Sequence, residues 1–325
     1  MRYLFSFVLA FAVSAALGRV LIPWLRALKA GQSIKEIGPV WHMSKQGTPT
    51  MGGIMFIAGI LVAVLAVGWV DFRQGRFGAL FVTLFALVFG AIGFFDDYMK
   101  VKHHQNEGLT AAQKFLLQLA AAIAFTVLLR YTGYLSPDVY IPFANVQFQI
   151  PWVVYMIFAA FVMVGTVNAV NITDGVDGLA TGVTMPVALF YLAVSILWKT
   201  VELGIFSAAL FGGLCAFLLY NFHPAKVFMG DTGSLFLGGA VCGMAFALDM
   251  PLILILIGVI YLVETLSDII QVTYFKLTHG KRVFRMAPLH HHFEMGGWSE
   301  EKLFAVFTGV TLLACLIAFF GVSGR

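Results

Sequence analysis

Charged residues and cysteines are both scarce in this chain. Asp, Glu, Lys and Arg make up only 11% of its 325 residues, whereas they make up about a quarter of a typical soluble domain. The cysteines are three, Cys215, Cys242 and Cys315, and none belongs to a CxxC or Cys/His motif. A soluble enzyme is therefore excluded, and neither a disulfide framework nor a zinc site is expected.

Apolar residues fill the chain instead, at 60% of the sequence and a mean hydropathy of +0.92. We therefore predict an all-α integral membrane protein, with residues 1–325 forming one polytopic domain. A helix needs about 20 apolar residues to cross a bilayer. Ten stretches qualify, at about 3–25, 50–70, 78–95, 115–134, 152–170, 178–198, 203–220, 235–249, 251–275 and 303–322. The first resembles a secretory leader, but its apolar run continues to Trp24, so we interpret it as an uncleaved span.

The distribution of positive charge predicts the orientation. Thirteen Lys and Arg residues lie in the loops after the odd-numbered spans, and six lie in the other loops and at the termini. Positive loops stay in the cytoplasm, so both termini are expected outside. All eight histidines also fall in or beside the odd-numbered loops. This sorting of reactive groups predicts an active site on the cytoplasmic face.

The first reactive motif is GFFDDYMK, at residues 93–100. Its two adjacent carboxylates, Asp96 and Asp97, end an apolar span. They could simply mark the membrane boundary. However, acidic groups at the mouth of a span are costly unless water, a cation or another partner compensates them. Lys100 lies one helical turn after Asp96 and would share its face.

The second motif is NAVNITDGVDG, at residues 168–178. Asp-Gly is a turn dipeptide, so a tight turn between two spans is one interpretation. The loop contains no Lys or Arg, and Asp174 and Asp177 therefore lack a local counter-charge. That pattern suits a divalent cation or a hydroxyl-rich ligand. It lacks the ligands and the distal Glu of an EF-hand.

The third motif is NFHPAKVFMGDTGS, at residues 221–234, directly before the eighth predicted span. Small residues at a helix N-terminus allow backbone N–H groups to approach a phosphate. Asp231 adds a hard oxygen ligand. Asp, Thr and Ser also cap helices well, and capping is compatible with ligand binding.

Two further stretches are RMAPLHHHFE, at residues 285–294, and SKQGTPTMGG, at residues 44–53. Three consecutive histidines cannot easily face one metal ion, and no cysteine supports them. When protonated, they would donate hydrogen bonds to anions. The second stretch suits a phosphate or substrate loop, but it is also an ordinary turn.

Together the motifs provide five carboxylates, several cations and helix starts that favour anions. Carboxylate oxygens favour Mg²⁺, with Mn²⁺ as a substitute, over zinc. Cationic side chains would hold the remaining phosphate charge. The residues thus predict a metal-assisted phosphoryl transfer at a membrane surface with one lipid-borne reactant. They do not define the substrate.

The motifs also carry a family resemblance. The stretches GTPTMGG, FFDDYMK, NAVNITDGVDGLA, NFHPAKVFMGDTGSL, ETLSDIIQV and MAPLHHHFE run from about residue 45 to about residue 300. With them the chain resembles the phospho-N-acetylmuramoyl-pentapeptide transferases, within the polyprenyl-phosphate N-acetylhexosamine-1-phosphate transferase superfamily. The resemblance implies a homodimer in the bacterial cytoplasmic membrane. It also implies Mg²⁺-dependent transfer from UDP-MurNAc-pentapeptide to undecaprenyl phosphate, which gives lipid I and UMP.

The resemblance implies a catalytic set. Asp231 would be the Mg²⁺ ligand, with Asp96, Asp97 and Asp174 as further candidates. Asp96 would be the base that deprotonates the lipid phosphate, and Asp97 would assist it. His290 would contact the substrate or its diphosphate.

The resemblance also implies a substrate-binding set. Lys45, Lys100 and Lys114 would hold phosphates, and Asp174 and Asp177 would bind the uridine or complete the metal shell. Asn221, Phe228 and Gly230 would line the uridine pocket, where Phe228 stacks on uracil. Thr50, Asn171, Gln271 and His291 complete the set, with Gln271 in the nucleotide pocket.

Two questions stay open at this level. The lipid phosphate could attack the donor directly, or Asp96 or Asp97 could first form an aspartyl-phosphosugar. The chain could also be a sibling enzyme that transfers GlcNAc-1-phosphate from UDP-GlcNAc. It could also be an ion-coupled transporter instead of an enzyme, although a transporter would need charges near the middle of the membrane. No nucleic-acid partner is expected.

Overall fold

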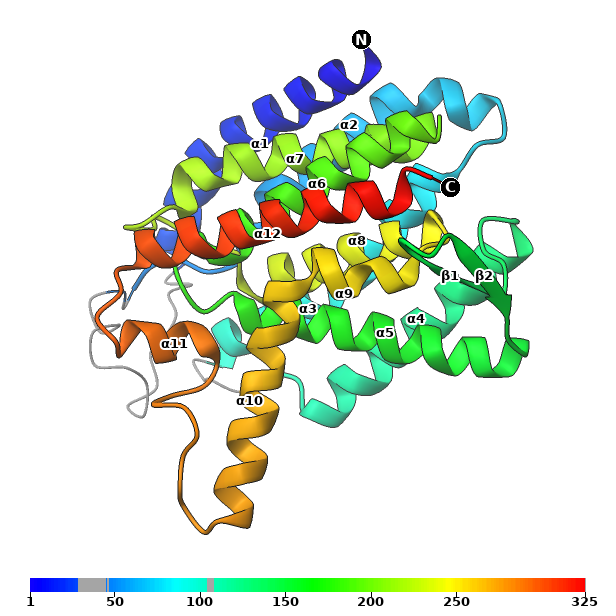
Figure 1. The fold of residues 1–325 in the computed structure, drawn as a ribbon. Coiled ribbons are helices and arrows are strands. Elements are labelled where there is room, and N and C mark those ends of the chain that lie inside the picture. Colours follow the sequence, from blue (N-terminus) through cyan, green and yellow to red (C-terminus); the bar gives the residue numbers. More distant parts are fainter. Residues whose placement is uncertain (29–44, 46, 104–107, 325) are drawn as a thin grey trace.

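The computed structural model describes residues 1–28, 45, 47–103 and 108–324, and they form a stack of helices (Figure 1). In chain order the longer helices are α1 (Arg2–Ala27), α2 (Gly53–Arg73), α3 (Gly78–His103), α4 (Ala111–Tyr131), α5 (Trp152–Thr173), α6 (Leu179–Leu197), α7 (Val201–Asn221), α8 (Gly230–Ala247), α10 (Val259–Leu277) and α12 (Glu300–Val322). Shorter elements are β1 (Asp138–Ile141), β2 (Val146–Gln149), the 3-10 helix η2 (Pro251–Ile253), α9 (Leu254–Ile257) and α11 (Leu289–Glu294).

The protein is mostly helical, and eight of its described helices are long and apolar enough to cross a membrane. A ninth span results if the bent pair of residues 251–257 and 259–277 counts as one. Helix α8 is not among these eight, because its first turn contains the polar Gly-Asp-Thr-Gly-Ser segment of residues 230–234.

A continuous span was predicted over residues 251–275, and the structure divides it. The helical axis bends by 80° at the break between Ile257 and Val259. Pro251 starts the short 3-10 helix, and Gly258 caps α9 before α10 begins. Figure 1 shows α10 leaving the stack in a direction that crosses the other helices. Proline is common at the start of a helix and glycine at its C-terminal end, so these two residues explain where the short helices begin and end.

A small β-hairpin was missed by the all-α prediction. Strands β1 and β2 pair antiparallel, with Asp138 opposite Gln149 and Ile141 opposite Val146. The hairpin contacts the end of α12, where the Phe143 N–H donates to the Gly321 carbonyl oxygen at 2.9 Å. Four-residue strands give too short a pattern to be recognised in a loop between two apolar spans.

Helix α8 forms the centre of the stack. Helices α3 and α5 pack on it, and all of its residues from Thr232 to Ala247 are buried. Glycines allow the closest approaches: a Cβ at Gly53 would overlap the backbone of Gly233, and one at Gly93 would overlap the carbonyl group of Asp231. The start of α8 is thus held directly against α2 and α3.

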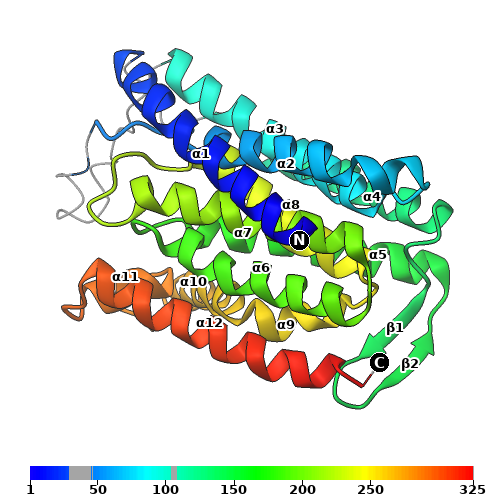
Figure 2. The same cartoon turned by 90° about the horizontal axis from the view of Figure 1, so that it is seen from above.

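The reactive motifs and the termini lie at opposite ends of the stack. The guanidinium of Arg2 pairs with Asp71, in the last turn of α2, whereas Gly53 at the start of α2 contacts Gly233. Seen from above, α2, α1, α7, α6 and α12 lie side by side, with the hairpin at one end and α11 at the other (Figure 2). The N-terminus and the C-terminus therefore share the end away from α11.

Candidate functional site

The start of α8 is fixed by Asp97. Its carboxylate accepts hydrogen bonds from the Asp231 N–H at 3.2 Å, the Thr232 N–H at 2.9 Å and the Thr232 hydroxyl at 2.7 Å. Helix N-termini leave N–H groups without partners, and a carboxylate satisfies them while it complements the helix dipole. Gly230 begins the helix at φ +69°, a conformation that glycine adopts without strain. Asp231 is thereby placed in the first turn.

Two lysines bridge Asp96 and Asp231. The Lys100 ammonium lies 2.6 Å from Asp96 and 3.0 Å from Asp231, and the Lys114 ammonium lies 3.0 Å and 2.7 Å from the same carboxylates. The second Asp96 oxygen accepts the Leu109 N–H at 2.7 Å. Residues from α3, α4 and α8 therefore form one compact charged group, in which the side chain of Asp96 is almost fully buried.

Three carboxylates in this group could hold a metal ion. Oxygen atoms of Asp96, Asp97 and Asp231 all lie within 4.8 Å of one another. An all-carboxylate donor set suits Mg²⁺ or Mn²⁺. The Asn171 amide donates to Asp231 at 2.9 Å and to the Ser234 hydroxyl at 2.8 Å, which leaves the second Asp231 oxygen directed to the lysines.

Asp174 lies in a desolvated region where other carboxylates act on it. Desolvation, together with the charges of Asp231 and Asp97, raises the pKa of Asp174 well above its usual range. A divalent cation placed among these carboxylates would relieve that repulsion. The residues thus fit the metal that the sequence predicts.

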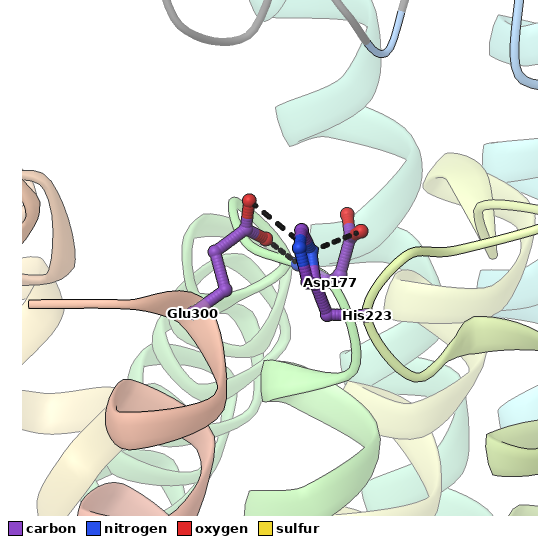
Figure 3. A group of neighbouring side chains, drawn as sticks. All are labelled: Asp177, His223 and Glu300. Carbon is purple, nitrogen blue, oxygen red and sulfur yellow. Dashed lines mark hydrogen bonds and ion pairs between the residues drawn. The ribbon is translucent and has the colours of Figure 1, made fainter.

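A second charged cluster includes Asp177, three residues after Asp174. Asp177, His223 and Glu300 come from three separate segments (Figure 3). The His223 Nδ1 lies 3.1 Å from Asp177 and 3.5 Å from Glu300. Lys45 joins them, with its ammonium 2.7 Å from Asp177 and 2.6 Å from Glu300. Glu300 also accepts the Asp177 N–H at 3.0 Å.

This second cluster differs in kind from the first. Its oxygen and nitrogen atoms are also close enough to hold a metal ion. However, one of its three possible metal donors is a histidine nitrogen, and the Lys45 ammonium bonds both of its carboxylates, as the two lysines do in the first cluster. We therefore interpret Lys45, Asp177, His223 and Glu300 as an ion-paired clasp that joins the residues before α2 to the loops after α5 and α7 and to the start of α12.

The three consecutive histidines have three different partners. His290 is buried and lies with Nδ1 3.0 Å from Glu264 in α10. His291 Nδ1 lies 2.6 Å from Glu294, and His292 Nδ1 accepts the Arg285 N–H at 3.1 Å. Two groups of side chains in the described part of the chain could hold a metal ion, and neither group includes any of these three histidines. These separate partners do not direct the three rings toward one shared metal ion.

Three predicted substrate-binding residues gather at the start of α8. The Phe228 N–H donates to Pro49 at 2.9 Å, and the Phe228 carbonyl accepts the Gly52 N–H at 2.8 Å. A Cβ at Gly230 would lie 2.7 Å from the Thr50 hydroxyl. Thr50, Phe228 and Gly230 therefore adjoin the carboxylate group. In the motif of residues 44–53, Ser44 and Gln46 lie outside the described residues.

Two other predicted residues support the backbone. The Asn221 side chain is buried, accepts the Thr181 hydroxyl at 2.9 Å and donates to the Val227 carbonyl at 3.1 Å. The Gln271 side-chain oxygen accepts the Val283 and Phe284 N–H groups at 3.0 Å each. Both side chains thus hold the loops that surround the site.

Four residues of the site were not singled out from the sequence. Thr232 donates to Asp97, and Glu264 bonds His290. The other two, His223 and Glu300, belong to the clasp. Glu264 carried a usable signal, because a carboxylate within a predicted span is expensive and is commonly functional. The other three resemble ordinary polar residues at helix ends.

Comparison with known proteins identifies the family. Residues 79–249, more than half of the chain, match the family model described as glycosyl transferase family 4. Residues 45–57 match the phospho-N-acetylmuramoyl-pentapeptide-transferase signature 1.

Curated relatives match over nearly the whole length. A phospho-N-acetylmuramoyl-pentapeptide-transferase of Clostridium acetobutylicum is 48% identical over 318 residues, which cover 97% of this chain and 98% of the relative. The enzyme of the same name from Carboxydothermus hydrogenoformans is 47% identical over 324 residues, with 98% of each chain covered. That from Clostridium botulinum strain Alaska E43 is 48% identical over 97% of this chain and 94% of the relative. The chain therefore belongs to the phospho-N-acetylmuramoyl-pentapeptide-transferase family of membrane enzymes.

Proposed function

We propose that the chain transfers phospho-MurNAc-pentapeptide from UDP-MurNAc-pentapeptide to undecaprenyl phosphate, giving lipid I and UMP. The observation that carries this proposal is the group formed by Asp96, Asp231, Lys100 and Lys114 at the start of α8. It joins carboxylates that suit Mg²⁺ to two ammonium groups that suit phosphate, at one end of a helical stack.

The lysines are well placed to bind both anionic reactants. Each ammonium contacts two carboxylates, and its remaining charge and donors can turn to phosphate oxygens. The reaction brings two negatively charged groups together, so the main tasks of the protein are to position them and to neutralise their charge.

Asp96 is the proposed base for the lipid phosphate. When Lys100 and Lys114 turn toward phosphate, the Asp96 oxygen that they now contact becomes able to accept a proton. Asp97 is less suited to act directly, because its carboxylate accepts three hydrogen bonds from the first turn of α8. We infer a single displacement, in which the lipid phosphate oxygen attacks the β-phosphate and UMP leaves.

Mg²⁺ is the proposed cofactor, with Mn²⁺ as a substitute. Asp231 would hold it, with Asp96, Asp97 and Asp174 nearby. Bound there, the ion would neutralise charge on the diphosphate of the donor. Asn171 orients the Asp231 carboxylate by its 2.9 Å hydrogen bond.

The nucleotide is assigned to the surroundings of α8. Phe228 would stack on uracil, beside Thr50 and Gly230, and Asn221 and Gln271 would shape the pocket through the loops that they hold. From the clasp, Asp177 and Lys45 would face the uridine or its phosphates. His290 and His291 would face the sugar diphosphate.

The setting is proposed to be the bacterial cytoplasmic membrane, crossed by ten spans. Both termini would lie outside, and the motifs would lie at the cytoplasmic surface, as the charge distribution predicts. The chain would act as a homodimer. Except for Glu264 in α10, the charged groups of the site gather at helix starts and ends, which disfavours an ion-coupled transporter.

The test is product formation by the purified protein. UDP-MurNAc-pentapeptide and undecaprenyl phosphate should give a lipid-linked product and UMP with Mg²⁺, and no product after chelation by EDTA. UDP-GlcNAc should not replace the donor. Product from UDP-GlcNAc alone would assign the sibling activity instead, and a phosphosugar trapped on the protein without lipid would replace the single displacement by the two-step route.

A further inference from the structure

Glu264 is a buried carboxylate that follows the apolar first turn of its helix. It lies in α10, its side chain is inaccessible to solvent, and no Lys or Arg pairs with it in the described part of the chain. It accepts the backbone N–H of His290 at 3.1 Å and contacts the ring Nδ1 of the same residue at 3.0 Å. A buried carboxylate is strongly unfavourable without such partners. Both partners belong to one residue, His290.

The other ring nitrogen of His290 has no partner. Nε2 is buried and makes no hydrogen bond among the described residues, although the side chain is only 1% exposed. A buried polar atom without a partner costs about 1–3 kcal/mol. In native proteins such an atom is rare and calls for a specific explanation, such as a role toward a ligand.

The direction of that nitrogen is defined by Gly175. A Cβ at Gly175 would overlap Nε2 of His290, so the ring lies directly on the backbone of this loop. Gly175 follows Asp174, whose carboxyl group senses the charges of Asp231 and Asp97, and precedes Asp177 of the clasp by two residues. Nε2 therefore faces the loop between the carboxylate group and the clasp.

We propose that Glu264 is a positioning residue for His290. It accepts a hydrogen bond from the Nδ1–H and holds the ring so that Nε2 faces the sugar diphosphate at the loop of residues 174–177. A carboxylate that binds one ring nitrogen fixes the tautomer and the orientation, and it stabilises the imidazolium form. The Nε2–H of that form is a donor, which matches the acceptor-only oxygens of a diphosphate. This inference rests on the proposed function and adds Glu264 to its machinery.

The kinetic test uses Glu264→Gln, His290→Asn and the double variant. The first change keeps the size of the side chain but removes its charge, so we expect kcat to fall about 10–100-fold, the range found for partners of functional histidines, with KM changed less. Glu264 acts through His290, so the double variant should be no slower than His290→Asn alone. An unchanged Glu264→Gln enzyme, or losses that multiply in the double variant, would overturn the inference.

A structural effect is separated by two further measurements. Glu202→Gln changes another buried glutamate, at the opposite end of the stack, and should keep its activity. Nitrogen-15 NMR of histidine-labelled protein, with His290→Asn to assign the signal, should show Nδ1 protonated and hydrogen-bonded in the native chain but altered in Glu264→Gln. An unaltered His290 signal contradicts the inference. A native enzyme that forms no lipid product contradicts the proposed function instead, and the NMR result still decides the role of Glu264.

Discussion

At the scale of single residues, neighbouring carboxylates have different environments. Asp97 binds three donors of one helix start, whereas Asp96 binds one backbone N–H and two ammonium groups. The first arrangement builds α8, and the second can be rearranged when phosphates compete for the lysines. Under the proposed mechanism, adjacent positions in the sequence thus supply a structural carboxylate and a reactive one.

Asp231→Asn tests the metal ligand. The change removes a charge that contacts Lys100 and Lys114 and lies among the carboxylates. We expect kcat to fall at least about 100-fold, the usual effect of losing a charge-stabilising group at the reaction centre, with no recovery at saturating Mg²⁺. Turnover is measured as UMP release, and Asp138→Asn in the hairpin serves as the control. Full turnover of Asp231→Asn at saturating Mg²⁺ would remove Asp231 from the metal site.

At the scale of elements, close packing and ion pairs position these residues. Glycines bring α2 and α3 onto the start of α8, and the clasp ties α12 to the loop after α5. The clasp is local in space, but it joins residues as far apart in sequence as 45 and 300. The site therefore depends on helices that contribute little chemistry of their own.

Gly93→Ala tests the packing of α3 on α8. Its Cβ would overlap the carbonyl group of Asp231, so α8 must shift or the helices must separate. Overpacking typically costs about 1–3 kcal/mol, and we expect a lower melting temperature together with a loss of activity. Gly165→Ala is the matched control, since a Cβ added to this glycine of α5 would meet no atom within 4 Å. Equal melting temperatures of the two variants would contradict this account.

Glu300→Gln tests the clasp. The carboxylate of Glu300 contacts Lys45 and the Asp177 N–H, and hydrogen bonds to charged groups contribute about 1.5–3 kcal/mol. We expect KM for the nucleotide sugar to rise about tenfold or more. The buried Glu202, at the start of α7 and far from the clasp, provides the control Glu202→Gln. Steady-state kinetics of both variants decide the matter, and similar KM values would refute a role for the clasp in substrate binding.

At the scale of the whole molecule, polar chemistry occupies one end of an apolar stack. The charged group at the start of α8, the clasp and helix α11 lie away from the termini and from the hairpin (Figure 1). In the proposed reaction, the lipid phosphate would reach this end from the membrane, and the nucleotide sugar would reach it from water. The orientation of the stack in the membrane then determines which compartment supplies the nucleotide.

Single-cysteine labelling tests that orientation. With the three native cysteines replaced by alanine, a cysteine at Gln74, after α2, should react with a membrane-impermeant maleimide on intact cells. A cysteine at Thr278, after α10, should react only after the cells are opened, because the positively charged loops are predicted to be cytoplasmic. The reverse pattern would invert the topology.

The sequence was sufficient for the membrane class, and its motifs contain most of the charged residues that the structure brings together. The sequence motifs already place Asp96 near Lys100 and Asp231 near Thr232, because the residues of each pair are close along the chain. The sequence did not reveal Glu264 and His290 as partners, nor Glu300 in the clasp, because tertiary packing brings these residues together. The 80° bend was missed for a related reason: the apolar composition of residues 251–277 is the same whether the helix is straight or broken.

The glycines around α8 have a consequence for how this chain can vary. Gly53 contacts Gly233, and Gly93 contacts Asp231, so each position is limited by atoms of a partner helix rather than by its own backbone. A larger residue at one position would require the facing helix to move, and that movement would displace the first turn of α8. We therefore expect an alignment of relatives to show these positions either invariant or covarying with their contacts, while the lipid-facing surface drifts freely.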